Sequence, residues 1–205
     1  MYYREKMSRL YVPEAYALAF FFAEIPWITI MVFVAVPPIY FMVGLNATAA
    51  AFFFYIFVVF LITLAFTSLG MLAAAYFSSA DVAQSVVGAI IPLFFAFGGL
   101  FITETNMPVG WRWAFFADPI SHTIEALVPA QFVFDCTANV NCPSITVFDP
   151  KTNSYAQQDT LAYVEEQYAL NYDNRWPDVG YLAVYIVGFQ ILHCLCVRYV
   201  SHITR

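Results

Sequence analysis

Charged side chains are unusually few in this sequence. Asp, Glu, Lys and Arg make up 11% of the 205 residues, against about 25% in soluble domains. The net charge of -6 excludes a basic surface for nucleic acid. The sequence lacks a phosphate-binding loop and the His-Glu-x-x-His and Gly-x-Ser-x-Gly patterns, so no enzymatic motif is present. His122, His193 and His202 are isolated, and Asp118 and Ser121 beside His122 on one helix turn do not make a preorganised catalytic triad.

Long hydrophobic runs are what the sequence has instead of charge. Hydrophobic residues make up 62% of the chain, and a helix needs roughly 20 consecutive apolar residues to cross a bilayer. Four runs are long enough, and they are apolar all round rather than alternating, which favours helices over a β-barrel. The sequence therefore predicts an all-α integral membrane protein surrounded by lipid, with four transmembrane helices at residues 16–43, 49–77, 82–102 and 179–200.

The basic residues predict the orientation. Positively charged side chains collect on the cytoplasmic side of membrane proteins, and here they flank the first and last runs, at Arg4, Lys6, Arg9, Arg198 and Arg205. Segment 103–178 holds three Lys or Arg residues and ten carboxylates. Both termini are therefore expected in the cytoplasm, and segment 103–178 on the extracellular side.

Two cysteines lie in the segment expected outside. Disulfides persist in oxidising compartments, so a Cys136–Cys142 disulfide is predicted, with two free thiols as the alternative. Cys194 and Cys196, near the inner end of the last run, are expected to be apolar helix fillers or a palmitoylation site. Asn46 begins an Asn-Ala-Thr acceptor pattern so close to the membrane that no glycan is expected there.

Few polar groups interrupt the runs. Glu24 lies near the start of the first run, where a structural or coupling role is favoured over proton carriage. Pro26 and the Pro37-Pro38 pair remove backbone donors and are expected to kink the same helix. Gly98-Gly99, at the outer end of the third run, is expected to allow a close helix approach or a helix break.

Residues 107–132, MPVGWRWAFFADPISHTIEALVPAQF, are too apolar for an ordinary loop and too polar for an ordinary span. Tryptophan favours the membrane interface, and Pro119 and Pro129 are expected to divide the stretch into short helices. A re-entrant or interfacial helix pair at residues 110–132 on the extracellular side is the predicted structure. Backbone at membrane depth must pack on protein or line a water-filled cavity. The helix pair is therefore expected to cover protein or such a cavity on the extracellular side.

The order of these elements resembles a known family. The opening YYREKMSRLYVPEAYALAFFFAEIPW is followed by a third run ending in GGLFI, then by residues 107–132, a loop with cysteines, YVEEQYALNYDNRWPDVGYL and a final span. This order is similar to the membrane domain of G-class ATP-binding cassette transporters, of the pleiotropic-drug-resistance type. The resemblance covers essentially the whole chain, which would be spans three to six of a six-span exporter domain.

The resemblance assigns roles by position. Residues 1–15 would form a cytoplasmic coupling segment, with Tyr3, Arg4 and Glu5 docking on a nucleotide-binding domain, while Glu24 and Pro26 match an element that opens the first span here. The implied substrate cavity is lined by Gly88, Pro92 and Phe95, the implied exit plug is Leu100 and Phe101, and Cys136 and Cys142 match the outer-loop disulfide region.

The implied function is ATP-driven export of hydrophobic drugs, lipids or sterols across the plasma membrane. ATP and magnesium would bind a nucleotide-binding domain outside this chain, which is then a fragment of a longer protein or a truncated product. The other implied partners are a second membrane half and the hydrophobic cargo. An ion-coupled carrier or channel, or a non-transporting scaffold, is the alternative. The cargo, a half-size or full-size parent, and which half supplies the chain stay open.

The orientation can be tested by labelling intact cells. A membrane-impermeant reagent should modify a cysteine introduced at Trp113, and should modify Cys136 after reduction, because segment 103–178 is expected outside. A cysteine introduced at Ser79, in the short link between the second and third runs, should react only after permeabilisation. The reverse pattern would contradict the predicted topology.

Overall fold

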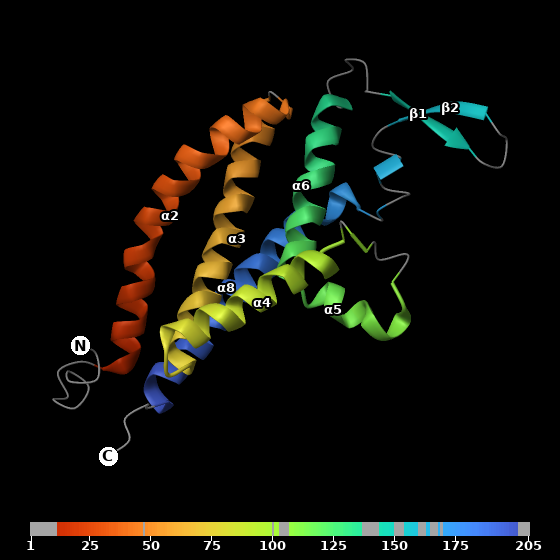
Figure 1. The fold of residues 1–205 in the computed structure, drawn as a ribbon. Coiled ribbons are helices and arrows are strands. Elements are labelled where there is room, and N and C mark those ends of the chain that lie inside the picture. Colours follow the sequence, from red (N-terminus) through yellow and green to blue (C-terminus); the bar gives the residue numbers. More distant parts are fainter. Residues whose placement is uncertain are drawn as a thin grey trace.

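A bundle of four long helices dominates the structure (Figure 1). The computed structural model describes residues 12–46, 48–99, 101–102, 107–136, 144–149, 154–159, 163–164, 168 and 170–200. The long helices are α2 (Pro13–Val43), α3 (Ala49–Tyr76), α4 (Ala80–Phe97) and α8 (Arg175–Tyr199), the last preceded by the short η3 (Tyr172–Asn174). All four are long and apolar enough to cross a membrane, η3 and α8 counting as one span. The chain is thus a multi-pass membrane protein.

Helix α3 is the centre of the bundle, since it packs against α2, α4, α6 and α8. One apolar cluster joins Ile28 and Val32 of α2 to Ile56 and Leu64 of α3. A second joins α3, α6 and α8 through Val58, Ala126 and Leu182. The start of α2 and the end of α8 lie at the same end of the bundle (Figure 1), where Arg198 and Glu14 form an ion pair of 2.9 Å. The first and last long helices thus meet at one end of the bundle, and the cytoplasmic location of both termini stays a prediction.

Two helices lie in the segment after α4, with bounds that differ from the expected 110–132, and their re-entrant placement stays a prediction. A 3-10 turn, η2 (Val109–Trp111), leads into α5 (Arg112–Phe116), and α6 follows over Pro119–Cys136. The prediction that Pro129 divides this stretch is wrong, because Pro129 lies inside α6. Pro129 is fully buried, so the packing of α6 against α3 and α8 outweighs the loss of one backbone hydrogen bond. Likewise α2 stays one helix across Pro26, Pro37 and Pro38.

Beyond α6 the described chain contains strands that the helical prediction did not include. β1 (Ser144–Asp149) pairs antiparallel with β2 (Ser154–Asp159), with Ser144 opposite Asp159 and Asp149 opposite Ser154. Ile-Thr-Val at 145–147 is a β-branched run of the kind enriched in strands. In Figure 1 this hairpin lies at the end of the bundle opposite the start of α2.

The Gly98-Gly99 pair makes both the break and the close approach expected from the sequence. Helix α4 ends at Phe97, and Gly99 has a φ of 91°, which favours glycine. A Cβ at Gly98 would lie 2.7 Å from Cγ2 of Ile120, and one at Gly99 would lie 3.0 Å from Cε2 of Phe115. The lack of side chains therefore lets α4 pack directly on the start of α6.

Replacing Gly98 with Ala should destabilise the protein by about 1–3 kcal/mol, because the added methyl group overpacks the contact with Ile120. Thermal unfolding of the detergent-purified protein is the measurement. Gly188→Ala is the matched control, since a Cβ at Gly188 meets nothing within 4 Å and alanine is the better helix former. Equal melting temperatures for the two variants would contradict the steric account.

Candidate functional site

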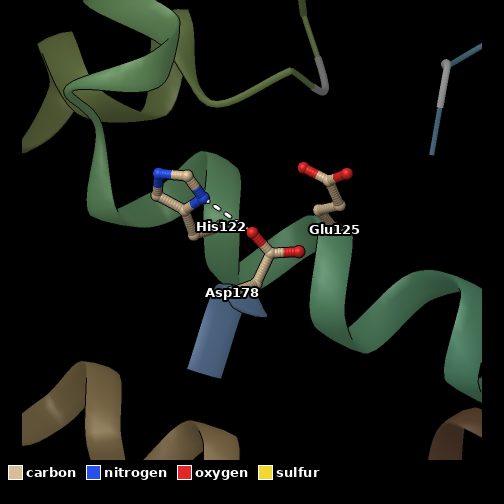
Figure 2. Close-up of side chains that lie close together, drawn as sticks. All are labelled: His122, Glu125 and Asp178. Carbon is tan, nitrogen blue, oxygen red and sulfur yellow. Dashed lines mark hydrogen bonds and ion pairs between the residues drawn. The ribbon is translucent and has the colours of Figure 1, made fainter. Parts of the chain in front are cut away.

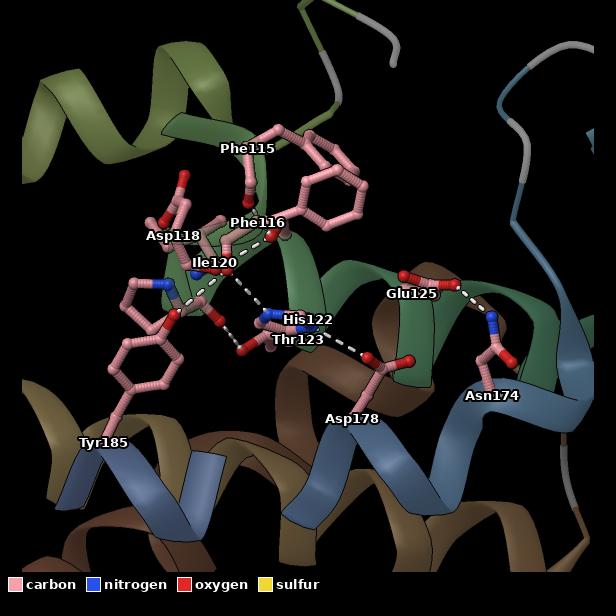
Figure 3. Close-up of polar contacts among 12 residues, drawn as sticks. Phe115, Phe116, Asp118, Ile120, His122, Thr123, Glu125, Asn174, Asp178 and Tyr185 are labelled. Atoms are coloured by element: carbon pink, nitrogen blue, oxygen red, sulfur yellow. Dashed lines mark hydrogen bonds and ion pairs between the residues drawn. The ribbon is translucent and has the colours of Figure 1, made fainter. Parts of the chain in front are cut away.

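Polar side chains converge where α5, α6 and the start of α8 meet (Figure 3). Nδ1 of His122 lies 2.8 Å from Oδ1 of Asp178. Nε2 of the same ring lies 3.2 Å from the carbonyl oxygen of Phe116, and the ring stacks on Tyr181 with 4.7 Å between centroids. His122 and Asp178 are both buried. This pair ties α6 to α8 across 56 residues of chain.

The pKa of His122 reflects opposing effects. Burial disfavours the charged imidazolium and on its own lowers the pKa. The hydrogen bonds to Asp178 and to the Phe116 carbonyl, with the charges of Asp178 and Glu125, outweigh burial and raise the pKa above its usual value. Both ring nitrogens face oxygen acceptors, which matches a protonated ring.

Asp118 caps the start of α6 from a buried position. Its Oδ1 accepts a hydrogen bond of 2.8 Å from the Ile120 N–H, which is the usual role of Asp before a helix. Burial raises the pKa of Asp118 to about 7, against the lowering effects of that hydrogen bond and of nearby His122. At neutral pH this carboxyl is therefore divided between its neutral and charged forms.

Ser121 does not join His122 in a catalytic arrangement. Its hydroxyl points to the carbonyl oxygens of Phe115 and Asp118, each at 2.7 Å. The hydroxyl thus fastens α5 to α6, and the ring nitrogens of His122 are directed at Asp178 and Phe116. The adjacent Asp, Ser and His have structural partners here, in keeping with the interpretation of the sequence.

The described part of the chain contains one group of donors suited to a metal ion. Donor atoms of His122, Glu125 and Asp178 all lie within 4.8 Å of one another (Figure 2). They border a cavity of about 470 Å³ that is also lined by Phe115, Phe116, Asn174, Pro177 and Tyr181. One feature of the sequence points to this group, since His122 and Glu125 are three residues apart and share a helix face.

The predicted cavity residues lie on α4. Gly88, Pro92 and Phe95 are all exposed, and spacings of four and three residues place them on one side of the helix. Phe101 is 80% exposed. In α2, Glu24 is half-buried and Pro26 is exposed.

Other predicted residues fall outside what the structure describes. Tyr3, Arg4, Glu5, Leu100 and Cys142 lie outside the described residues, and so does the side chain of Cys136 at the end of α6. The coupling, plug and disulfide assignments therefore stay predictions.

Asn46 is 9% exposed. Its Oδ1 accepts a 3.0 Å hydrogen bond from the Thr48 N–H, and its carbonyl oxygen receives the Tyr40 hydroxyl. This burial agrees with the prediction that Asn46 carries no glycan, which stays a prediction.

Comparison with known protein families identifies this helix arrangement. The profile of the ABC-2 type transporter membrane domain matches residues 1–132, well over half of the chain. The chain belongs to the ABC-2 type transporters. A second profile, described as CDR ABC transporter, matches residues 155–204 of this transporter chain.

Relatives of this chain include plant transporters. ABC transporter G family member 53 of Oryza sativa subsp. japonica is 29% identical over 192 residues, covering 94% of this chain and 12% of that protein. Pleiotropic drug resistance protein 1 of Nicotiana tabacum is 34% identical over 133 residues, covering 64% of this chain and 9% of that protein. The transporter chain thus spans about a tenth of the length of these relatives and is a membrane part of the G-class, pleiotropic-drug-resistance type.

His122 has partners in the fold that the sequence interpretation did not name. It is isolated along the chain, but in the folded transporter it lies against Asp178, Glu125, Tyr181 and the Phe116 carbonyl. Asp178 comes from the first turn of α8, where a helix N-terminus stabilises a negative charge. The sequence feature that indicates such a partner is the position of Asp178, because a carboxylate at the start of an apolar span needs a polar partner.

Replacing Asp118 with Asn should reduce the pH dependence of this transporter's stability. Because the folded pKa of Asp118 lies above the unfolded value, its stabilising effect is complete at low pH and is lost as pH rises from about 4 to about 7. Asn keeps the cap on Ile120 without the titration.

Melting temperatures in detergent at pH 5, 6, 7 and 8 are the measurement. Wild type should lose a few °C more than the variant across this range, since 1 kcal/mol shifts the melting temperature by about 2–4 °C at this size. A residual slope of the same sign is expected from His122, whose pKa is also raised. Parallel curves for the two proteins would contradict the assignment.

Proposed function

We propose that this chain is the membrane-spanning part of an ATP-driven exporter that moves hydrophobic compounds, such as drugs, lipids or sterols, across the plasma membrane. ATP and magnesium bind to a nucleotide-binding domain. That domain docks on the coupling segment of this chain, which contributes Tyr3, Arg4 and Glu5. A second membrane half completes the substrate cavity. Both termini lie in the cytoplasm.

The observation that carries this proposal is the exposed side of α4 in a chain of the ABC-2 family. Helix α4 packs on α3 and, at its end, on α6. Gly88, Pro92 and Phe95 lie together on the side that these neighbours leave open. An apolar helix face with one large aromatic ring suits one wall of a cavity for flat, hydrophobic cargo, and a second membrane half supplies the opposite wall.

The position of α6 supports its role as an outer, re-entrant cover. Ala126 of α6 packs beside Val58 of α3, which lies about 13 Å from the start of α3 at 1.5 Å per residue. Five residues later, Gln131 meets the Tyr40 hydroxyl near the end of α2. The N-terminal half of α6 therefore lies alongside the transmembrane helices, and its Ser121 and His122 side chains are bonded to α5 and α8, as polar groups at that depth require.

Export is favoured over an ion-coupled carrier or channel by the side chains on this face. Ion pathways carry charged or strongly polar residues within the membrane, whereas the exposed side of α4 offers only Gln84 and Ser85 besides Asp81 at its start. A non-transporting scaffold would not require a helix pair packed over the end of α4.

The test is transport by the full-length protein in inside-out membrane vesicles. A hydrophobic fluorescent substrate should accumulate only with ATP, and Phe95→Ala should weaken its apparent affinity about two- to tenfold, the value of one lost aromatic contact. Phe33→Ala is the matched control, because Phe33 on α2 is 53% exposed and Phe95 is 49% exposed. Glu5→Arg should reduce ATP-driven transport by disturbing the coupling segment.

Three results would contradict the proposal. Transport that follows an ion gradient without ATP would indicate a carrier, and the absence of any transport would indicate a scaffold. An effect of Phe33→Ala equal to that of Phe95→Ala would remove α4 from the cavity wall.

A further inference from the structure

Three side chains of types that can ligate a metal ion come together from two helices. His122 and Glu125 share one face of α6, and Asp178 rises from the first turn of α8 between them (Figure 2). Their donor atoms lie within 4.8 Å of one another. Imidazole and carboxylate groups at this spacing are the ligand types of zinc-like ions.

The second carboxylate oxygen of Asp178 independently indicates a ligand. Oδ1 is bonded to His122, but Oδ2 is buried and accepts no hydrogen bond from any residue that the structure describes. Asp178 is only 3% exposed, and an unsatisfied buried carboxylate oxygen is costly. In Figure 2 this oxygen is directed to the side on which Glu125 lies, and the cavity of about 470 Å³ borders all three residues.

We propose that His122, Glu125 and Asp178 bind a divalent transition-metal ion of the zinc class, with water completing the coordination. Nδ1 of His122 is the nitrogen ligand, and the carboxylates of Glu125 and Asp178 supply oxygen. Binding releases the proton shared by Nδ1 and Asp178 to solvent, as metal binding to imidazole does. The nitrogen ligand and the small number of carboxylates favour zinc over magnesium or calcium, which prefer all-oxygen sites.

Neighbouring groups already orient the ligands. Nε2–H of His122 faces the Phe116 carbonyl, and the Asn174 amide donates a 2.8 Å hydrogen bond to Oε1 of Glu125. Metal-ligating histidines and carboxylates are commonly held by such outer partners. Tetrahedral zinc, at about 2.0–2.2 Å from each ligand, separates ligand atoms by roughly 3.3–3.6 Å. Glu125 therefore closes in slightly, and His122 and Asp178 move apart by less than about 1 Å.

The bound ion would fasten the start of α6 to the start of α8. That function differs from transport itself, and the proposal does not depend on the exporter assignment.

The experiment measures zinc binding to the full-length protein in detergent, without nucleotide and after removal of any polyhistidine tag. Melting temperature is followed against free Zn²⁺ set by a chelator buffer. Zn²⁺ should raise the melting temperature of the wild type. Glu125→Gln, which can still accept from Asn174, should raise the half-saturating Zn²⁺ concentration at least tenfold, since even outer partners of a ligand are worth 10- to 100-fold.

Asp173→Asn is the matched control, because it removes an exposed carboxylate that is close in sequence to the site but outside it, and its zinc response should equal that of the wild type. Identical zinc curves for wild type and Glu125→Gln would overturn the proposal, as would equal stabilisation by Mg²⁺ or Ca²⁺. If Glu125→Gln does not fold, Co²⁺ added to the wild type decides. Ligand-field bands displaced by Zn²⁺ support the site, and the spectrum of aqueous Co²⁺ overturns it.

Discussion

Hydrocarbon offers no hydrogen bonds, and this constraint decides which polar groups the helices can carry and where. Several buried polar side chains of the described chain join different elements to one another. Tyr40 links α2 to Gln131 of α6, Gln190 of α8 reaches the Ala17 carbonyl of α2, and His122 of α6 meets Asp178 of α8. Apolar packing brings the helices together, and these few polar contacts set which residues face each other.

Much of the fold follows from the sequence because lipid makes hydrophobic length decisive. The four long runs correspond to α2, α3, α4 and α8, and the Gly98-Gly99 pair has both roles expected of it. A sequence prediction is wrong where tertiary packing outweighs the tendency of a residue to end a helix. Pro129 does not end α6, because buried contacts on α3 and α8 compensate for its missing donor. The β1–β2 hairpin was overlooked because the helical signal of the spans dominated the interpretation.

The contact between His122 of α6 and Asp178 of α8 could not be predicted from the sequence. His122 and Asp178 are 56 residues apart, and no spacing rule joins them. Only the packing of the start of α8 on α6 brings the imidazole to the carboxylate. By contrast, Gly88, Pro92 and Phe95 were assigned through the family resemblance, and they lie on one side of α4 because they are four and three residues apart in one helix. Their role in a substrate cavity stays a prediction, whereas the contact between His122 and Asp178 depends on the fold.

The bare backbone at Gly98 has a mechanical consequence. Since not even a methyl group fits between Gly98 and Ile120, the end of α4 cannot move closer to α6 without displacing the first turn of α6. Ser121 in turn fastens that first turn to α5, and His122 fastens it to α8. A displacement of the end of α4 toward Ile120 would therefore press on the first turn of α6 and, through Ser121 and His122, act on α5 and α8.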